Sequence, residues 1–334
     1  MSDIGPRGSK LLGGLRSCLR RAELAFTGQV LNSRRTKGDW GDLDPIRLLS
    51  TSKDTLESLK VTSSWFTEAG QAVVYPRMVS LTVEDAWLPS TPILHRAFPN
   101  LSEIEASYGA ATIPSDVSSA EWRAASRAYQ HEHGSWRELQ HFEGSSDDLY
   151  LLSPLCRIRR IAFTHVDGDG DASIEADVLH DILSDTRPSH LELVLFLNLN
   201  DNLLNQDWTA ALFEHRTPPL QILHIELKVS EEHGWEEVAD LTEALDALQV
   251  ALASSSLSEF ELSIEGLDRP EDDPIVPLIK GLDVDALARN LKDSSKFLKA
   301  VSVHLNIESV PQDCEGEKEG SLEVKAREDD SGGS

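Results

Sequence analysis

The sequence predicts an α/β fold, an irregular solenoid in which short parallel strands form one curved sheet and helices lie on its convex side. Three observations predict this fold. A strand-like apolar pattern recurs along the 334 residues, and helical patterns fill the intervals between its copies. In addition, 40% of the residues are hydrophobic, which is enough to bury a core.

The repeated strand pattern has three apolar residues, separated first by two mostly polar residues and then by one. Its copies are Leu56-Leu59-Val61, Met78-Leu81-Val83, Leu101-Ile104-Ala106, a weaker Trp136-Leu139, Ile158-Ile161-Phe163, Pro188-Leu191-Leu193, Leu220-Leu223-Ile225, Leu257-Phe260-Leu262 and Leu298-Val301-Val303. Alternation places the last two apolar residues on one face of a strand and the polar residue between them on the other. Because so short a strand cannot bury its apolar face alone, we expect the copies to stack as a parallel sheet.

Parallel strands need crossover connections, and four intervals show the apolar spacing of helices: 174–185, 207–215, 235–253 and 284–293. Ser118 and Glu121 have the spacing of a capping box and indicate a further helix. A Rossmann-type sheet also alternates strands and helices. However, no Gly-x-Gly-x-x-Gly turn follows any strand, and the first three units are too short to hold a full helix. These features favour the solenoid.

The sequence divides into three segments. Residues 1–44 are basic, and we expect a helical cap or a partly disordered segment. Residues 45–310 hold the repeats, with an insertion at 110–135. Residues 311–334 are acidic and have almost no apolar side chains, so they cannot offset the entropy lost on ordering, and we expect them to be disordered.

The net charge of −26 limits the classes of partner. A body this acidic repels phosphate backbones, so we do not expect nucleic-acid binding. The longest apolar stretch, at 191–199, is far shorter than a membrane span. Cys18, Cys156 and Cys314 are too far apart for a disulfide framework and indicate a reducing compartment. We therefore expect a cytoplasmic or nuclear protein that binds neither nucleic acid nor membranes.

The acidic loop at 167–178 is the nearest approach to a metal site. Asp167, Asp169 and Asp171 alternate as in a calcium loop, but Ala172 and Val178 stand where such a loop needs a glycine and a bidentate carboxylate. A solvated acidic turn is the favoured interpretation.

Three histidines, His131, His133 and His141, also lack the i, i+4 spacing of a helical zinc pair. The chain contains neither a Gly-x-Ser-x-Gly elbow nor a Gly-x-x-x-x-Gly-Lys loop. We therefore expect no catalytic residues, no cofactor and no metal.

Four phrases resemble the leucine-rich-repeat half of fungal F-box-type proteins: DTLESLKV (54–61), YPRMVSLTVEDAW (75–87), AFPNLSEIEAS (97–107) and LLSPLCRIRRIAFTH (151–165). The resemblance covers about 45 to 305. It implies a substrate adaptor of a ubiquitin ligase, in which the repeats hold the substrate and ligase components are partners. Residues 1–44 lack a Leu-Pro-x-Glu-type opening and are too short for an F-box bundle, so ligase attachment does not follow from the resemblance.

The function that we expect is a non-catalytic scaffold for protein–protein interaction, which uses the polar residues on the concave side of the sheet. The candidate contacts with an unidentified protein partner are Lys60, Thr82, Glu105, His224 and Glu261. Two alternatives stay open. One is an α/β enzyme without a short motif, whose site is built from scattered acids and histidines. The other is a ligase adaptor whose F-box is missing through truncation or a misplaced start.

Overall fold

The structure is a computed structural model, and it describes residues 18–26, 44–67, 73–84, 86, 88–107, 117–164, 174–196, 206–213, 219–229, 241–269, 275–309 and 320–329. The chain forms two compact units, 1–165 and 166–334. We call them the N-terminal unit and the C-terminal unit, and we describe each by itself. Both are built from alternating strands and helices, so the α/β class predicted from the sequence is confirmed.

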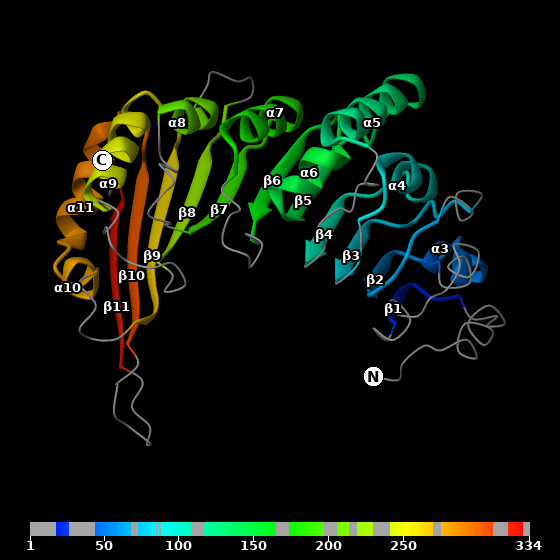
Figure 1. Ribbon diagram of the computed structural model, residues 1–334, viewed down its shortest axis with the longest axis horizontal. Helices are drawn as coiled ribbons and strands as arrows, with labels where there is room; N and C mark the ends of the chain where they lie inside the picture. The colour runs from blue at the N-terminus through cyan, green and yellow to red at the C-terminus, as the bar shows by residue number, and fades with distance from the viewer. Residues whose placement is uncertain are drawn as a thin grey trace, which may run out of the picture. The chain divides into compact units, whose positions relative to one another are not determined.

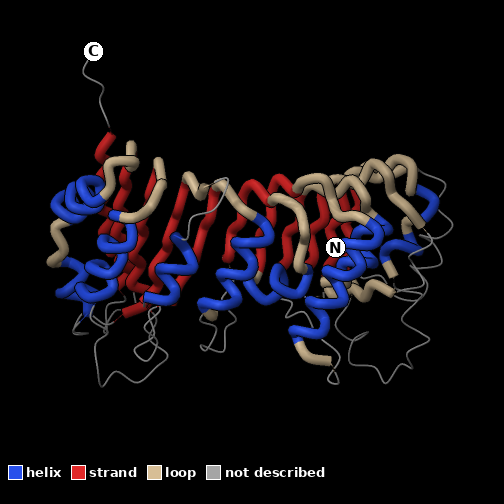
Figure 2. Tube along the Cα trace, turned by 90° about the horizontal axis from the view of Figure 1, so that it is seen from above, coloured by secondary structure: helices blue, strands red, loops and turns tan. Residues whose placement is uncertain are grey.

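The described elements of the N-terminal unit are short. They are β1 (Arg21–Ala25), α3 (Pro45–Leu48), the 3-10 turn η2 (Ser50–Ser52), β2 (Ser58–Thr62), β3 (Ser80–Glu84), α4 (Thr91–Ala97), β4 (Glu103–Ser107), α5 (Ser119–His133), β5 (Leu139–Gly144), α6 (Ser146–Leu152) and β6 (Ile158–Phe163). The strands lie side by side in chain order, and neighbouring strands are parallel (Figure 1). The helices lie on one face of this sheet, so its other face carries no described helix (Figure 2).

Alternation along the strands sorts side chains between the two faces. On β2 and β3, Leu59, Val61, Leu81 and Val83 are buried, whereas Lys60 is half-buried. The buried residues face the helices, because the period of two along a strand sends every second side chain to the same face. The apolar positions of the repeated sequence pattern are therefore the core of this unit.

Side-chain caps set where two helices of this unit begin. Asp44 is buried ahead of α3, where its Oδ1 accepts a hydrogen bond from the amide of Ile46 at 2.9 Å. Its Oδ2 accepts from the amide and the hydroxyl of Thr67 at 3.2 and 2.6 Å. The predicted capping box is confirmed at α5: the amide of Glu121 donates to Ser118 Oγ at 3.3 Å, and the amide of Ser118 donates to Glu121 Oε2 at 2.9 Å.

The C-terminal unit has longer strands. Its elements are α7 (Ala176–Thr186), β7 (His190–Phe196), α8 (Gln206–Phe213), β8 (Ile222–Val229), α9 (Leu241–Ala253), β9 (Glu259–Arg269), α10 (Ile275–Lys280), α11 (Val284–Ser294), β10 (Ala300–Ser309) and β11 (Gly320–Asp329). Strands β7 to β10 are parallel and in chain order, and β11 is antiparallel to β10. In register across β7 to β10, Leu193, Ile225, Leu262 and Val303 are all buried. Here too the described helices cover one face of the sheet (Figure 2).

A helical cap or a partly disordered segment is the expectation for 1–44, and the described residues near its middle form a strand instead. Residues 21–25 form β1, which pairs with β2 so that Leu24 is in register with Val61. Leu24 and Phe26 are both buried, although the segment around them is basic. Two apolar side chains at alternate positions complete the core beside β2, and the strand satisfies backbone groups along the edge of β2.

Disorder is the expectation for 311–334, and the described part of this segment, residues 320–329, instead forms the strand β11. The other residues of the segment lie outside the described part of the chain. Val324 and Ala326 are in register with Leu305 and Val303, which are buried on β10. The tail is poor in apolar residues, but the few it has alternate with polar ones, which is the pattern of a strand. Pairing also satisfies the backbone groups along the edge of β10.

The helices predicted at 174–185, 207–215 and 284–293 are confirmed by α7, α8 and α11. Residues 241–253 of the predicted helix at 235–253 form α9, and its first residues lie outside the described part of the chain. The described part of the expected insertion at 110–135 is mainly α5, which is the crossover from β4 to β5. Of the helices that the structure describes, none is both long and apolar enough to cross a membrane.

Candidate functional site

The candidate site is the sheet face that lies opposite the helices in each unit, which we call the helix-free face. Three of the five residues predicted from the sequence lie on it in the N-terminal unit. Lys60 on β2, Thr82 on β3 and Glu105 on β4 occupy successive positions of one row, because the parallel register pairs Lys60 with Thr82 and Thr82 with Glu105. The parallel register thus places three residues that are far apart in the sequence side by side on one face.

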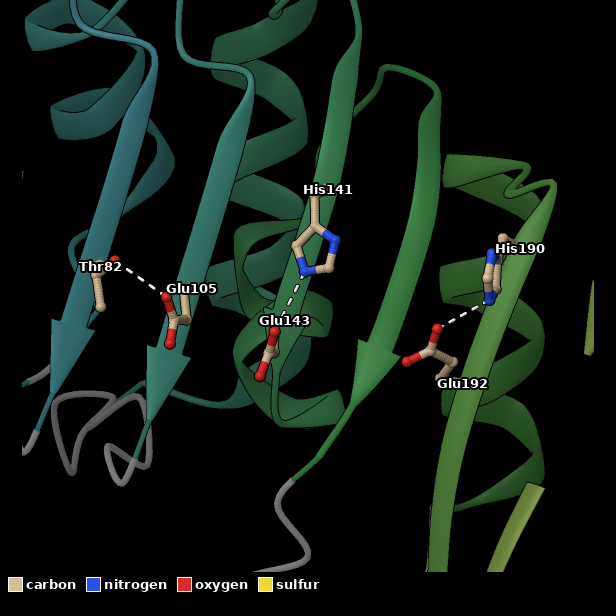
Figure 3. Close-up of polar contacts among 6 residues, drawn as sticks. All are labelled: Thr82, Glu105, His141, Glu143, His190 and Glu192. Carbon is tan, nitrogen blue, oxygen red and sulfur yellow. Dashed lines mark hydrogen bonds and ion pairs between the residues drawn. The ribbon is translucent and has the colours of Figure 1, made fainter. Parts of the chain in front are cut away.

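Polar contacts connect these residues to others on the same face. The hydroxyl of Thr82 donates a hydrogen bond to Oε2 of Glu105, with 3.1 Å between the two oxygens (Figure 3). On β5, Nε2 of His141 lies 3.3 Å from Oε2 of Glu143 (Figure 3). The same register places Glu143 next to Glu105. This face of the N-terminal unit is therefore an ordered, partly neutralised array of charges.

Lys60 forms the shortest of these ion pairs. Its Nζ is 2.6 Å from Oε1 of Glu84, and Glu84 Oε2 also accepts from the hydroxyl of Thr62 at 3.1 Å. The hydrogen bond from Lys60 lowers the pKa of Glu84, and the same bond raises the pKa of Lys60. Both groups are charged at neutral pH, but each is partly open to solvent.

The other two predicted residues, His224 on β8 and Glu261 on β9, lie in register on the C-terminal unit. Oε1 of Glu261 is 4.0 Å from Nε2 of His224 and 3.3 Å from Nε2 of His304 on β10. On β7, Nε2 of His190 is 2.8 Å from Oε1 of Glu192 (Figure 3). Each of these glutamates thus has a histidine as a charge partner.

A carboxyl pair lies further along the same strands. Nζ of Lys228 is 2.9 Å from Oε1 of Glu226 and 3.9 Å from Oε2 of Glu265, so one ammonium group contacts two carboxylates. Burial, followed by the charge of Glu226 and a hydrogen bond with it, raises the pKa of Glu265. Lys228 and a hydrogen bond from Asn306 act against this rise.

The geometry of the histidines does not fit nucleophilic catalysis. Ser263 Oγ lies 3.4 Å from His224 Nε2, and Glu261 also approaches His224 at Nε2. A Ser-His-acid triad needs the acid at the opposite ring nitrogen, where it orients the imidazole toward the hydroxyl. These three residues are therefore arranged as neighbours on a polar surface.

The metal sites considered from the sequence have no counterpart in the part of the chain that the structure describes. Within the described ranges, no group of three or more His, Cys, Asp or Glu side chains could hold a metal ion. His131 and His133 lie in the last turn of α5, whereas His141 lies on β5. Asp167, Asp169 and Asp171 lie outside the described residues.

Sequence reasoning missed several residues of this surface. Glu84, Glu143, Glu192, Glu226, Glu265 and His304 all lie on the helix-free face and contact other polar residues there. Their signal was present, since Glu84 follows Thr82 and Glu226 follows His224 by two positions, the period that returns a side chain to the same face. The contacts between strands had no such signal, because they depend on register.

The fold and this surface define a class: an α/β protein whose parallel strands carry helices on one face and polar side chains on the other. Comparison of the chain with protein-family models, with curated proteins and with solved structures finds no match. The geometry of the site is therefore the basis for the functional proposal.

Proposed function

We propose that this protein is a non-catalytic scaffold that binds another protein through its helix-free face, and that its units form an irregular leucine-rich-repeat-like solenoid with a curved sheet. One observation carries the proposal: in both units the described helices cover a single face of the sheet (Figure 2), and the opposite face carries half-buried polar side chains. A sheet face held by buried rows on its other side is rigid, and a rigid surface loses little entropy when a partner binds.

The distribution of polar side chains on this face favours a macromolecule as the partner. Lys60, Thr82 and Glu105 lie on three neighbouring strands, and Glu261 lies between histidines from two more. Groups spread across several strands suit an extended surface contact, in which polar pairs set register and specificity. By resemblance to F-box-type proteins, the partner would be the substrate of a ubiquitin ligase, and the protein would act in the cytoplasm or nucleus.

Affinity capture from the native cell, followed by mass spectrometry, tests this proposal. The bait variants are Lys60→Glu with Glu105→Lys for the N-terminal unit and Glu261→Lys for the C-terminal unit. Control baits carry Lys53→Glu and Asp246→Lys, which reverse charges at exposed positions off the strands. We expect the face variants to lose at least one partner that both controls retain. Recovery of the same partners by all baits would contradict the proposal.

An enzyme with a site of scattered acids and histidines is the second candidate, and one observation favours it. Glu265 has a raised pKa beside Glu226, and carboxyl groups of this kind serve as general acids. A screen of ester, glycoside and phosphate substrates, run with the unaltered protein and with Glu265→Gln, tests this candidate. Turnover that disappears in the variant would support it, and equal rates in both proteins would oppose it.

A further inference from the structure

The helix-free face of the C-terminal unit has an excess of negative charge. Its described side chains include one lysine, Lys228, and five glutamates: Glu192, Glu226, Glu259, Glu261 and Glu265. The excess among these described side chains lies on β7 to β9.

Strand β9 carries most of this charge in a regular arrangement. Glu259, Glu261 and Glu265 occupy alternate positions of the strand, with Ser263 between the last two. A strand rises about 3.3 Å per residue, so alternate positions repeat every 6.6 Å or so. The same repeat separates alternate side chains of any extended peptide. A peptide laid along β9 can therefore place a cationic side chain near each glutamate.

The contacts among the described residues of this face neutralise the carboxylates only in part. Glu261 is paired with His224 and His304, which carry positive charge only when protonated. Lys228 is shared between Glu226 and Glu265. The raised pKa of Glu265 reflects this incomplete compensation, because burial and the charge of Glu226 exceed the effect of Lys228. An added cation at this row would relieve the repulsion.

Within the proposed scaffold function, we infer that this face binds an extended segment of a partner protein that carries lysine or arginine at alternate positions and lies along β9. The inference rests on the proposed function and specifies the chemistry of its partner. Charge complementarity selects a basic segment. An extended segment keeps its alternate side chains at the strand's own spacing of about 6.6 Å along its whole length, whereas a helix presents cations on one face at uneven steps of three and four residues.

Two fluorescein-labelled peptides of about ten residues test the inference by fluorescence anisotropy with the full chain. One alternates lysine and serine, and the other has the same composition with all lysines in one block. Both have the same charge, so general attraction to an acidic protein acts on both equally. We expect the alternating peptide to bind at least about threefold more tightly, because an extended chain then presents all of its lysines on the side that faces β9, whereas the block peptide presents only about half of them.

Two double variants complete the test. Glu261→Gln with Glu265→Gln removes charge from β9 at nearly constant size, and Asp246→Asn with Asp293→Asn removes the same charge from α9 and α11, at positions that are exposed. Thermal melts followed by circular dichroism confirm that all variants fold. We expect about tenfold weaker binding of the alternating peptide for the β9 variant and less than about twofold for the helix variant.

Equal affinity of the two peptides, or equal weakening by the two double variants, would overturn the inference and leave only unspecific attraction between opposite charges. The scaffold proposal would survive that result if cellular capture still yields a partner whose recovery depends on the helix-free face. Conversely, suppose that the alternating peptide binds but no partner is captured from the cell. That result would oppose the scaffold proposal, although it would support the inference that this face binds an extended basic segment. The two failures are therefore distinguishable.

Discussion

Lys60 on β2 and Glu84 on β3 form an ion pair across the helix-free face, with Nζ and Oε1 2.6 Å apart. The pair joins neighbouring strands, and it lies on the surface that we propose as a binding site. Both side chains are partly open to solvent, so the pair contributes less to folding than its short distance suggests.

We expect Lys60→Gln to lower the free energy of unfolding by less than about 1 kcal/mol at pH 7. Glu84 has a lowered pKa in the folded state, mainly through its hydrogen bond with Lys60. Its stabilising effect is thus present above its ordinary pKa of 4.5 and is lost as pH falls through the lowered value. Urea unfolding at pH 7 and pH 3 should show the difference shrinking in acid. A loss that is unchanged at pH 3 would show that the pair is not its cause.

The buried cap Asp44 predicts a larger effect. In Asp44→Ala, the amide of Ile46 and both donors of Thr67 lose their acceptor, and we expect a loss of about 2 kcal/mol, measured by urea unfolding. Asp54→Ala is a matched control, because Asp54 is exposed in the turn before β2. Its change should stay within about 0.5 kcal/mol. Similar losses in both variants would contradict the role assigned to the cap.

Gly144 at the end of β5 predicts a steric effect. An added Cβ would lie 2.9 Å from the carbonyl oxygen of Ala106, and the φ angle of Gly144 is +156°. Gly134 also has a positive φ, +89°, but nothing lies within 4 Å of an added Cβ. We expect Gly144→Ala to cost about 3 kcal/mol and Gly134→Ala about 1 kcal/mol. Thermal unfolding of both variants gives the comparison, and an equal cost would rule out crowding against β4.

The carboxyl pair on the C-terminal unit predicts a pH dependence of opposite sign. The pKa of Glu265 is raised, first by burial and then by Glu226, so the folded state holds its proton more tightly than the unfolded state. Stability is therefore greatest below the ordinary pKa of 4.5 and is lost as pH rises through the raised value. Glu265→Gln should remove this loss, so that its unfolding midpoint changes less between pH 4.5 and 7 than that of the unaltered protein. Parallel pH profiles would exclude this role for Glu265.

Strand β11 predicts a change in association. Ending the chain after Ser309 removes the antiparallel strand and exposes the backbone N–H and C=O groups along the edge of β10. We expect the shortened chain to self-associate with increasing concentration, as light scattering after size exclusion would show. Replacing residues 320–329 by a glycine–serine segment keeps the length of the chain and the other charges of the tail, and this variant should self-associate in the same way. A monomeric shortened chain would show that β11 does not protect this edge.

Much of the local structure could be predicted because it depends on patterns within a few residues. The period of two in segments such as Leu59-Lys60-Val61 identified both the strands and the side of the sheet on which each residue lies. The spacing of Ser118 and Glu121 identified the start of α5 for the same reason. Composition was a poorer guide, because it did not predict the strands β1 and β11. In both segments a few apolar residues alternate with polar ones, and the segment pairs with a neighbouring strand.

The sequence by itself determined that Lys60, Thr82, Glu105, His224 and Glu261 are the polar positions between apolar residues of strands. Only the tertiary structure decided which of them are neighbours. Register between parallel strands depends on how each crossover helix packs, and the lengths of these crossovers differ along the chain. That packing places Glu261 between His224 and His304 and brings Lys60 to Glu84. Side-chain alternation is a local property of the backbone, whereas the contacts of a surface depend on the packing of the whole sheet.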